Sequence, residues 1–366
     1  MRLNKLFDET TINGMTLKNR FVRSATWEGL ANPDGTVTPK LTDLQVELAK
    51  GGTGLIITGF AYVLRDGQSV PWQLGIYSDD HLPGLKELVD AVHKAGGTIV
   101  CQIAHCGAFS NQQLTGEQPM GPSVLEGPEG PICREMTKGD IDNVVKAFRA
   151  AAIRAKKAGF DGVQIHGAHG FLLSEFLSPF FNKRTDEYGG SIRDRAKLVM
   201  DVYKTVREAV GADYPVLVKL NADDLLEGGL AEKDMLEVGE MLAKVGIDAI
   251  ELSSGTIFSL GQGDYNNSFS KIQFEEAYIQ DSAKHLKERV NVPVMMVGGI
   301  RSYGRADQLV KDGVTDYISL CRPLIREPGL VNRWKSGDTS KAKCISDNAC
   351  FGPALEGKGL YCVHNK

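Results

Sequence analysis

The amino-acid sequence predicts an α/β fold, a (β/α)8 TIM barrel, because short apolar runs alternate with helical segments along the chain. The expected strands are the eight runs 21–26, 54–60, 98–105, 162–168, 215–222, 249–255, 293–299 and 317–323. Runs that are apolar at successive positions predict strands covered on both faces. A parallel sheet closed into a barrel provides that cover without leaving an edge.

Segments with the spacing of an amphipathic helix separate most of the expected strands. They are 82–95, 138–158, 191–210, 231–245, 274–289 and 302–312. Several end in a glycine directly before the next strand, as at Gly97, Gly159, Gly246 and Gly313. Glycine at this position ends a helix and allows the chain to turn. The repeated order of strand, helix and glycine is what a barrel requires.

An open, doubly wound sheet would use the same alternation of strands and helices. Its dinucleotide-binding form needs a Gly-x-Gly-x-x-Gly turn after the first strand, and no such turn follows residues 21–26. The segment 108–138 is rich in Gly, Pro and Gln and is too long for a simple connection, so we expect it to fold over the active face. Residues 1–366 are expected to form one barrel domain with this insert and a cysteine-containing C-terminal tail.

Composition limits the kinds of partner that the protein can have. The formal net charge of −4 gives no general attraction to nucleic acid or anionic lipid, so we expect small-molecule partners and leave homo-oligomers open. No apolar run approaches the roughly 18 residues that span a bilayer, and the start lacks a secretory apolar segment. The odd number of cysteines, 7, indicates reduced thiols. These features predict a cytoplasmic location.

Two histidines, His166 and His169, lie at the end of the strand expected at 162–168 and in the loop that follows it. Catalytic side chains in barrels of this kind come from the C-terminal ends of the strands. The two imidazoles could donate hydrogen bonds to one electronegative oxygen. They could instead be structural, or they could ligate zinc in a metal-dependent hydrolase, although no carboxylate or cysteine completes a familiar ligand spacing.

Lys219 lies near the end of the apolar run 216–220 in the strand expected at 215–222, where an ammonium is costly unless a negative group meets it. Its partner is either a cofactor or one of the carboxylates Asp223, Asp224 and Glu251.

Gly298, Gly299 and Arg322 follow the last two expected strands. Exposed backbone N–H groups and a planar guanidinium suit a phosphate group, and barrels often bind phosphate at this position. The alternative is a tight turn beside an arginine that pairs with a surface carboxylate.

These residues resemble those of the Old Yellow Enzyme family of FMN-dependent oxidoreductases, in particular the branch of 2,4-dienoyl-CoA reductase and trimethylamine dehydrogenase. The resemblance extends over nearly the whole chain, and the run Arg-Thr-Asp-Glu-Tyr-Gly-Gly-Ser-Ile at 184–192 is highly specific to the family. The other matching segments are 17–22, 52–59, the strand of Gln102, 166–190, 298–299 and 321–323.

The resemblance implies that FMN lies in the barrel mouth. The residues implied to bind it are Ser24, Ala25, Thr26, Gly59, Gln102 and Lys219 at the ring, and Gly298, Gly299, Cys321 and Arg322 at the phosphate. NADH or NADPH would reduce the flavin, which would pass hydride to the β-carbon of an α,β-unsaturated carbonyl compound. His166 and His169 would bind the carbonyl oxygen, on which negative charge develops.

The resemblance also implies a substrate side formed by Trp27, Tyr62 and Phe171. Many relatives carry a proton-donating tyrosine where this chain has Phe171, so water, Tyr62 or Tyr188 would have to supply the proton. Otherwise the enzyme runs hydride from an amine or alcohol to FMN. Trp27 rather than Thr26 falls where relatives keep a cysteine or threonine near the flavin, so the flavin potential is expected to differ. A flavin-binding protein without catalytic activity is a further alternative.

The tail resembles the iron–sulfur segment of longer family members. Cys344, Cys350 and Cys362 match cysteines of that segment, but Asp347 stands where a fourth is expected. We therefore expect three reduced thiols and no metal, with a cluster or structural zinc as the alternatives.

Overall fold

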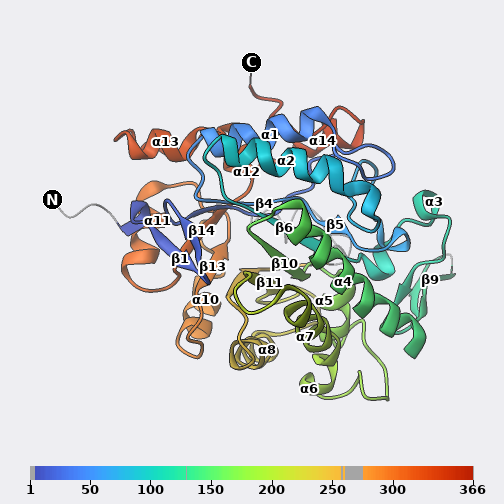
Figure 1. Ribbon diagram of the computed structural model, residues 1–366. Helices are drawn as coiled ribbons and strands as arrows, with labels where there is room; N and C mark the ends of the chain where they lie inside the picture. Colours follow the sequence, from blue (N-terminus) through green and yellow to red (C-terminus); the bar gives the residue numbers. More distant parts are fainter. Residues whose placement is uncertain (1–4, 129, 257–258, 260–274, 366) are drawn as a thin grey trace.

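Eight parallel strands pair in a ring in the computed structural model, which describes residues 5–128, 130–256, 259 and 275–365 (Figure 1). The barrel strands are β3 (Phe21–Arg23), β4 (Leu55–Ile57), β6 (Ile99–Ala104), β10 (Gly162–Gly167), β11 (Val216–Asn221), β12 (Ala249–Ser253), β13 (Val294–Val297) and β14 (Tyr317–Leu320). β14 pairs with β3 and β10 pairs with β6, which closes the ring. The predicted barrel is confirmed, and each strand ends before its predicted boundary because the last residues turn into the loops of the mouth.

Helices surround the barrel (Figure 1). They include α1 (Pro39–Lys50), α2 (Leu82–Lys94), α4 (Lys138–Ala158), α6 (Ile192–Arg195), α7 (Lys197–Val210), α8 (Glu232–Lys244), α10 (Gln280–Lys287) and α11 (Tyr303–Lys311). The predicted helix 191–210 is two helices that meet at Ala196. Phe274, where another helix was predicted to begin, lies outside the described residues, and α10 begins at Gln280. Helix α1 was not predicted.

Helix α4 begins and ends at the residues predicted for it, and local sequence signals explain both ends. Thr137 and Asp140 form a capping box at the start of α4, in which each side chain accepts a hydrogen bond from the backbone of the other. Gly159 follows its last residue with φ of 91°, a conformation that glycine adopts without steric cost.

The interior of the barrel is apolar at one end and polar at the other. Side chains of the apolar layer, such as Val22, Leu55, Leu217 and Met295, pack together with the N-terminal hairpin of β1 (Thr10–Ile12) and β2 (Met15–Leu17). Further along the same strands, Gln102, Gln164, Lys219 and Glu251 are equally buried. The hairpin thus closes one end, and the polar layer lies toward the mouth.

The insert at 108–138 forms a small three-stranded sheet of β7 (Met120–Gly121), β9 (Gly130–Glu135) and β8 (Leu125–Gly127) at the outer edge of the barrel (Figure 1). The Ala108 amide at its start donates to Glu175 Oε1 at 2.8 Å, in helix α5 (Leu172–Leu177). None of the described residues of the insert lines the cavity at the mouth. The lining of the cavity therefore gives no support to the expectation that the insert folds over the active face, which stays a prediction.

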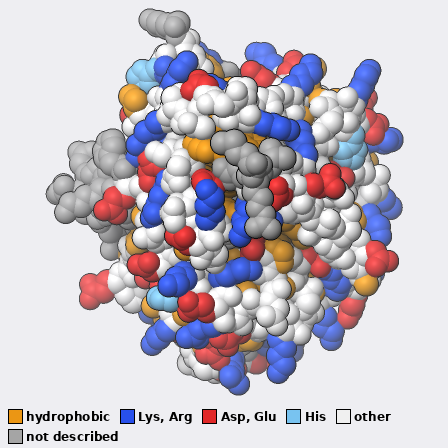
Figure 2. Space-filling model, turned by 90° about the vertical axis from the view of Figure 1, so that its left-hand side faces the viewer, with side chains coloured by type: hydrophobic (Ala, Val, Ile, Leu, Met, Phe, Trp, Pro, Cys, Tyr) orange, Lys and Arg blue, Asp and Glu red, His pale blue; other side chains and the backbone are white. Residues whose placement is uncertain are grey.

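The described surface agrees with the balanced composition. On the face shown in Figure 2, acidic and basic side chains are interspersed. Among the described residues, no helix has the length and apolar character needed to cross a membrane.

Candidate active site

A cavity of about 760 Å³ opens at the C-terminal ends of the barrel strands. Twelve of the residues predicted for the site line it: Ser24, Ala25, Thr26, Trp27, Gln102, His166, His169, Phe171, Lys219, Gly299, Cys321 and Arg322. Its volume lies within the usual range for small-molecule and cofactor sites. The cavity is therefore the candidate active site.

Three predicted site residues lie outside this lining. The Gly59 amide donates to Glu28 Oε1 at 3.0 Å, and the Gly298 carbonyl accepts from the Ala277 amide at 2.6 Å. The Tyr62 hydroxyl donates to the Asp34 carbonyl at 2.9 Å, and Tyr62 is not among the residues that line the cavity. A position after a strand does not determine which way a side chain or amide points.

His166 presents its Nε2 atom as a hydrogen-bond donor. Its Nδ1 atom accepts from the Ala168 amide at 3.3 Å, which places the imidazole proton on Nε2. Burial lowers its pKa well below 6.5, and the nearby His169 and Lys219 lower it further. At neutral pH the ring is therefore an uncharged donor.

His169 is held by two neighbouring strands. Its backbone has φ of 65°, an uncommon conformation for a residue with a side chain. The Asn221 side-chain oxygen accepts from its amide at 3.1 Å, and the Ser253 hydroxyl lies 2.7 Å from Nε2. Burial, and secondly Lys219, lower its pKa to about 3. The imidazole is neutral, and the orientation of the Ser253 hydroxyl decides which ring nitrogen carries its proton.

Aromatic rings surround the two imidazoles. The centroids of His166 and His169 are 5.2 Å apart with the rings nearly perpendicular, and Phe171 lies 5.1 Å from both His166 and Phe60. Phe60 was not predicted as a site residue. The two phenyl rings give His166 apolar surroundings, which agrees with its lowered pKa.

Lys219 belongs to a buried polar network. Its ammonium donates to the Ser24 hydroxyl at 2.7 Å and forms a salt bridge of 3.2 Å with Glu251 Oε2. β11 and β12 pair in parallel with Lys219 opposite Glu251, which explains why this carboxylate, rather than that of Asp223 or Asp224, meets the ammonium. The predicted carboxylate partner is therefore present, and Lys219 also lines the cavity, where it could meet a cofactor.

Arginines lie at another part of the cavity, beside Gly299. Gly299 has φ of 65°, and a Cβ atom there would lie 2.3 Å from the Glu275 carbonyl, so only glycine fits. Arg322 and Arg301 both line the cavity, and Arg301 had not been predicted. The sequence signal that could have identified Arg301 is its position two residues after the Gly298–Gly299 pair.

The C-terminal tail also lines the cavity, which the sequence had not indicated. Arg322 Nη1 donates to the Ser346 carbonyl at 3.1 Å and to Asn348 Oδ1 at 2.8 Å. Ser346 and Asn348 both have positive φ, so the tail makes a tight turn around the guanidinium. Phe351 and Leu355 extend this lining. The tail therefore supports the arginine and forms part of the site.

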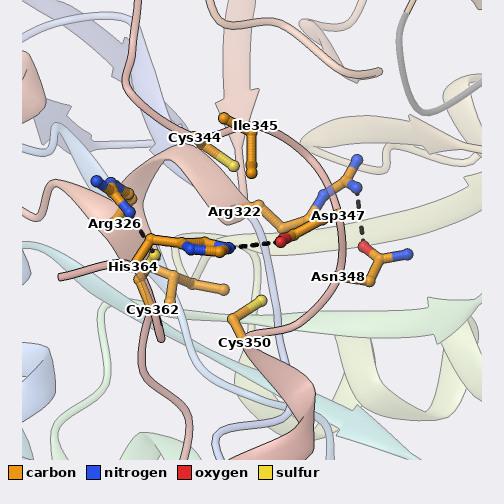
Figure 3. A pocket seen from close by; sticks show the side chains of 10 residues that line it. Arg322, Arg326, Cys344, Ile345, Asp347, Asn348, Cys350, Cys362 and His364 are labelled. Atoms are coloured by element: carbon orange, nitrogen blue, oxygen red, sulfur yellow. Dashed lines mark hydrogen bonds and ion pairs between the residues drawn. The ribbon is translucent and has the colours of Figure 1, made fainter.

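The tail cysteines lie around a smaller cavity beside the main one (Figure 3). Asp347 is paired with His364 at 2.6 Å, and Arg326 Nη1 donates to the Cys362 sulfur at 3.2 Å. Burial, then the nearby Cys321 and other sulfurs, raises the pKa of Cys350 to about 12. Across the part of the chain that the structure describes, no three His, Cys, Asp or Glu side chains are placed to hold a metal ion. The tail does not fit a four-thiolate cluster.

The main cavity has the donor set that a flavin mononucleotide requires. Arginines and Gly299 lie at one part of it, where a phosphate could bind, and Lys219 lies at another. The buried Oε1 atom of Gln102 has no hydrogen-bond partner among the described residues. Buried polar atoms are normally paired, so a polar ring system is the fitting occupant.

Comparison with known proteins identifies the relatives of this chain. Residues 5–341 match the model of the NADH:flavin oxidoreductase / NADH oxidase family. An NADH oxidase of Thermoanaerobacter brockii is 36% identical over 352 residues, which are 95% of this chain and 53% of that protein. The chain thus spans about half the length of this curated relative.

Solved structures show the same fold. A complex of 2-naphthoyl-CoA reductase with 2-naphthoyl-CoA superposes with a TM-score of 0.90 and 29% identity, covering 98% of this chain and 56% of that one. An old yellow enzyme homologue from Zymomonas mobilis superposes with a TM-score of 0.79 and 27% identity, covering 92% of this chain and 94% of that one.

Proposed function

Because the chain belongs to the NADH:flavin oxidoreductase / NADH oxidase family, the Old Yellow Enzyme family named from its sequence, we propose that it reduces activated C=C bonds of α,β-unsaturated carbonyl compounds. FMN is the cofactor of this family, and NADH or NADPH is the hydride donor. The observation that carries the proposal is the pair of neutral imidazoles, His166 and His169, in one cavity with Lys219.

The residues proposed to hold FMN are those that line the cavity. Lys219, Ser24 and the unpaired oxygen of Gln102 would bind the ring, and Gly299, Arg301 and Arg322 would bind the phosphate. When bound, FMN takes hydride from NAD(P)H and supplies it to the substrate.

The histidines would bind the substrate carbonyl. The Nε2–H group of His166 has no hydrogen-bond partner among the described residues and would donate to the carbonyl oxygen, and His169 would donate through Nδ1 when the Ser253 hydroxyl donates to its Nε2. Negative charge grows on this oxygen as hydride reaches the β-carbon, so these hydrogen bonds strengthen toward the transition state. Phe171 has no proton to give, and we propose that water protonates the α-carbon.

Oxidation of an amine or alcohol is the second candidate, favoured by Phe171. This direction needs a base to take the substrate proton, and a base is most effective when its pKa lies near the working pH. The pKa of about 3 at His169 makes that imidazole a weak base. The same property leaves it a neutral hydrogen-bond donor, which favours the reductase. The family match does not support the metal-dependent hydrolase alternative.

Anaerobic stopped-flow spectroscopy tests the proposal. The purified protein should be yellow, NADH or NADPH should bleach its flavin absorbance, and 2-cyclohexenone should restore it with formation of cyclohexanone. Cyclohexanone, which has the carbonyl but not the C=C bond, is the matched control and should restore nothing. Bleaching by an amine or alcohol, with no recovery on adding enones, would establish the second candidate instead.

A further inference from the structure

Glu251 is a buried carboxylate that touches the lining of the site from behind. It lies on β12 with no measurable exposure, and its Oε2 atom meets both Lys219 at 3.2 Å and Gln164 Nε2 at 2.9 Å. It is not among the residues that line the cavity. Glu251 would therefore act on a ligand in the cavity only through its neighbours Lys219 and Gln164.

Electrostatics keep Glu251 ionised. Burial by itself raises its pKa, but the charge of Lys219 and hydrogen bonds from Gln164, Ser24 and Ser319 outweigh this and bring the pKa below its ordinary value. The carboxylate and the ammonium are almost fully withdrawn from water, so solvent screens their interaction little. The pair presents to the cavity a cation whose charge is partly neutralised.

The carboxylate also orients two amides. An ionised carboxylate only accepts hydrogen bonds, so the Nε2 group of Gln164 must point toward Glu251. The Oε1 atom of Gln164 then accepts from Gln102 Nε2 at 2.7 Å. This leaves Gln102 Oε1 as the unpaired acceptor. Both effects of Glu251, on charge and on amide orientation, end at residues that line the cavity.

We propose that Glu251 is a positioning residue that lowers the reduction potential of the bound flavin, by neutralising part of the charge that Lys219 offers to the ring and by fixing the amide of Gln102. The inference rests on the FMN site proposed above. Two-electron reduction adds negative charge to the ring, and an uncompensated ammonium nearby would stabilise that charge. Removing the carboxylate should therefore make the flavin easier to reduce.

The test is a spectroscopic titration of holoprotein against a reference dye at pH 6. In Glu251→Gln, the equilibrium constant for flavin reduction should rise at least tenfold, which corresponds to about 30 mV for a two-electron couple. The dissociation constant for sulfite, which adds to the flavin and places negative charge on the ring, should fall in parallel. An equilibrium constant within twofold of wild type, in a variant that binds FMN, would overturn the proposal.

Glu175→Gln is the matched control, because Glu175 is equally buried and contacts the Ala108 amide of the insert. Its equilibrium constant should stay within twofold of wild type, whereas a shift as large as that of Glu251→Gln would mean that any buried Glu→Gln change perturbs the flavin.

If the Glu251→Gln variant alone does not fold, the same substitution can be measured in a protein that also lacks the charge of Lys219. In a Lys219→Met background, Glu251→Gln should change the equilibrium constant less than threefold, because no ammonium is left to neutralise. A larger change would show that Glu251 acts chiefly through the amide of Gln102 or directly on the ring, and would overturn the charge-neutralising role proposed here. Wild-type protein without flavin would instead contradict the proposed function itself.

Discussion

The Nε2 atom of His169 lies 2.7 Å from the Ser253 hydroxyl, which connects the loop after β10 to the end of β12. The hydroxyl can donate to Nε2 or accept from it, and the two arrangements put the imidazole proton on different nitrogens. This hydrogen bond restrains the rotation of the ring, which belongs to a loop residue with an uncommon backbone conformation. Ser253 therefore positions one of the two proposed donors.

Ser253→Ala should lower kcat/KM for 2-cyclohexenone roughly five- to tenfold, the effect of losing one hydrogen bond worth about 1 kcal/mol. FMN should remain bound, because Lys219 and the arginines are unchanged. Steady-state kinetics and the flavin spectrum check both points. Ser110→Ala is the control, since Ser110 is buried outside the cavity and its hydroxyl has no partner in the described structure. An equal loss in both variants would contradict a role for the Ser253 hydroxyl.

His166→Ala removes a donor whose Nε2–H group is not used within the described protein. Loss of one hydrogen-bond donor to a developing oxyanion typically costs about 100- to 1,000-fold in rate. We expect a decrease of this order in the rate at which enone reoxidises the flavin, with little change in the rate of reduction by NAD(P)H. Stopped-flow measurement of the two half-reactions separates these steps. An equal decrease in both would indicate a general disturbance of the site.

The rate of flavin reoxidation by enone should be constant between pH 6 and pH 8. Both imidazoles have a pKa below 6.5, chiefly because of burial, so they gain charge only as the pH falls through those lower values. Within the tested window they remain neutral donors. A tenfold decrease per pH unit above pH 6.5 would show instead that a protonated imidazolium is the active form.

The sequence predicted the barrel because apolar runs and glycine stops are local signals. It also predicted His166, Lys219 and Arg322, since the ends of parallel strands gather at one mouth whatever the details of packing. It could not show that Tyr62 lies outside the cavity lining, because the direction of that side chain depends on a hydrogen bond to Asp34 in another loop.

The contribution of the tail could not be predicted for a similar reason. Ser346 and Asn348 enter the site through contacts with Arg322, which lies more than twenty residues earlier in the chain. No periodic pattern marks such a contact. Glu251 was considered as a partner of Lys219, but only the pairing of β11 with β12 distinguishes it from Asp223 and Asp224.

Arg322→Leu should weaken FMN binding about 10- to 100-fold while leaving riboflavin binding nearly unchanged, because a hydrogen bond to a charged group contributes about 1.5 to 3 kcal/mol and riboflavin has no phosphate. Fluorescence titration of the deflavinated protein with each ligand measures both dissociation constants. Arg326→Leu is the matched control: this arginine contacts Cys362 at the smaller cavity and is not among the residues that line the main one. Asn348→Ala should give a smaller loss that is again confined to FMN, since it removes a bond that orients the Arg322 guanidinium but leaves its charge. Equal losses for FMN and riboflavin in Arg322→Leu would mean that the arginine only holds the tail in place and does not bind the phosphate.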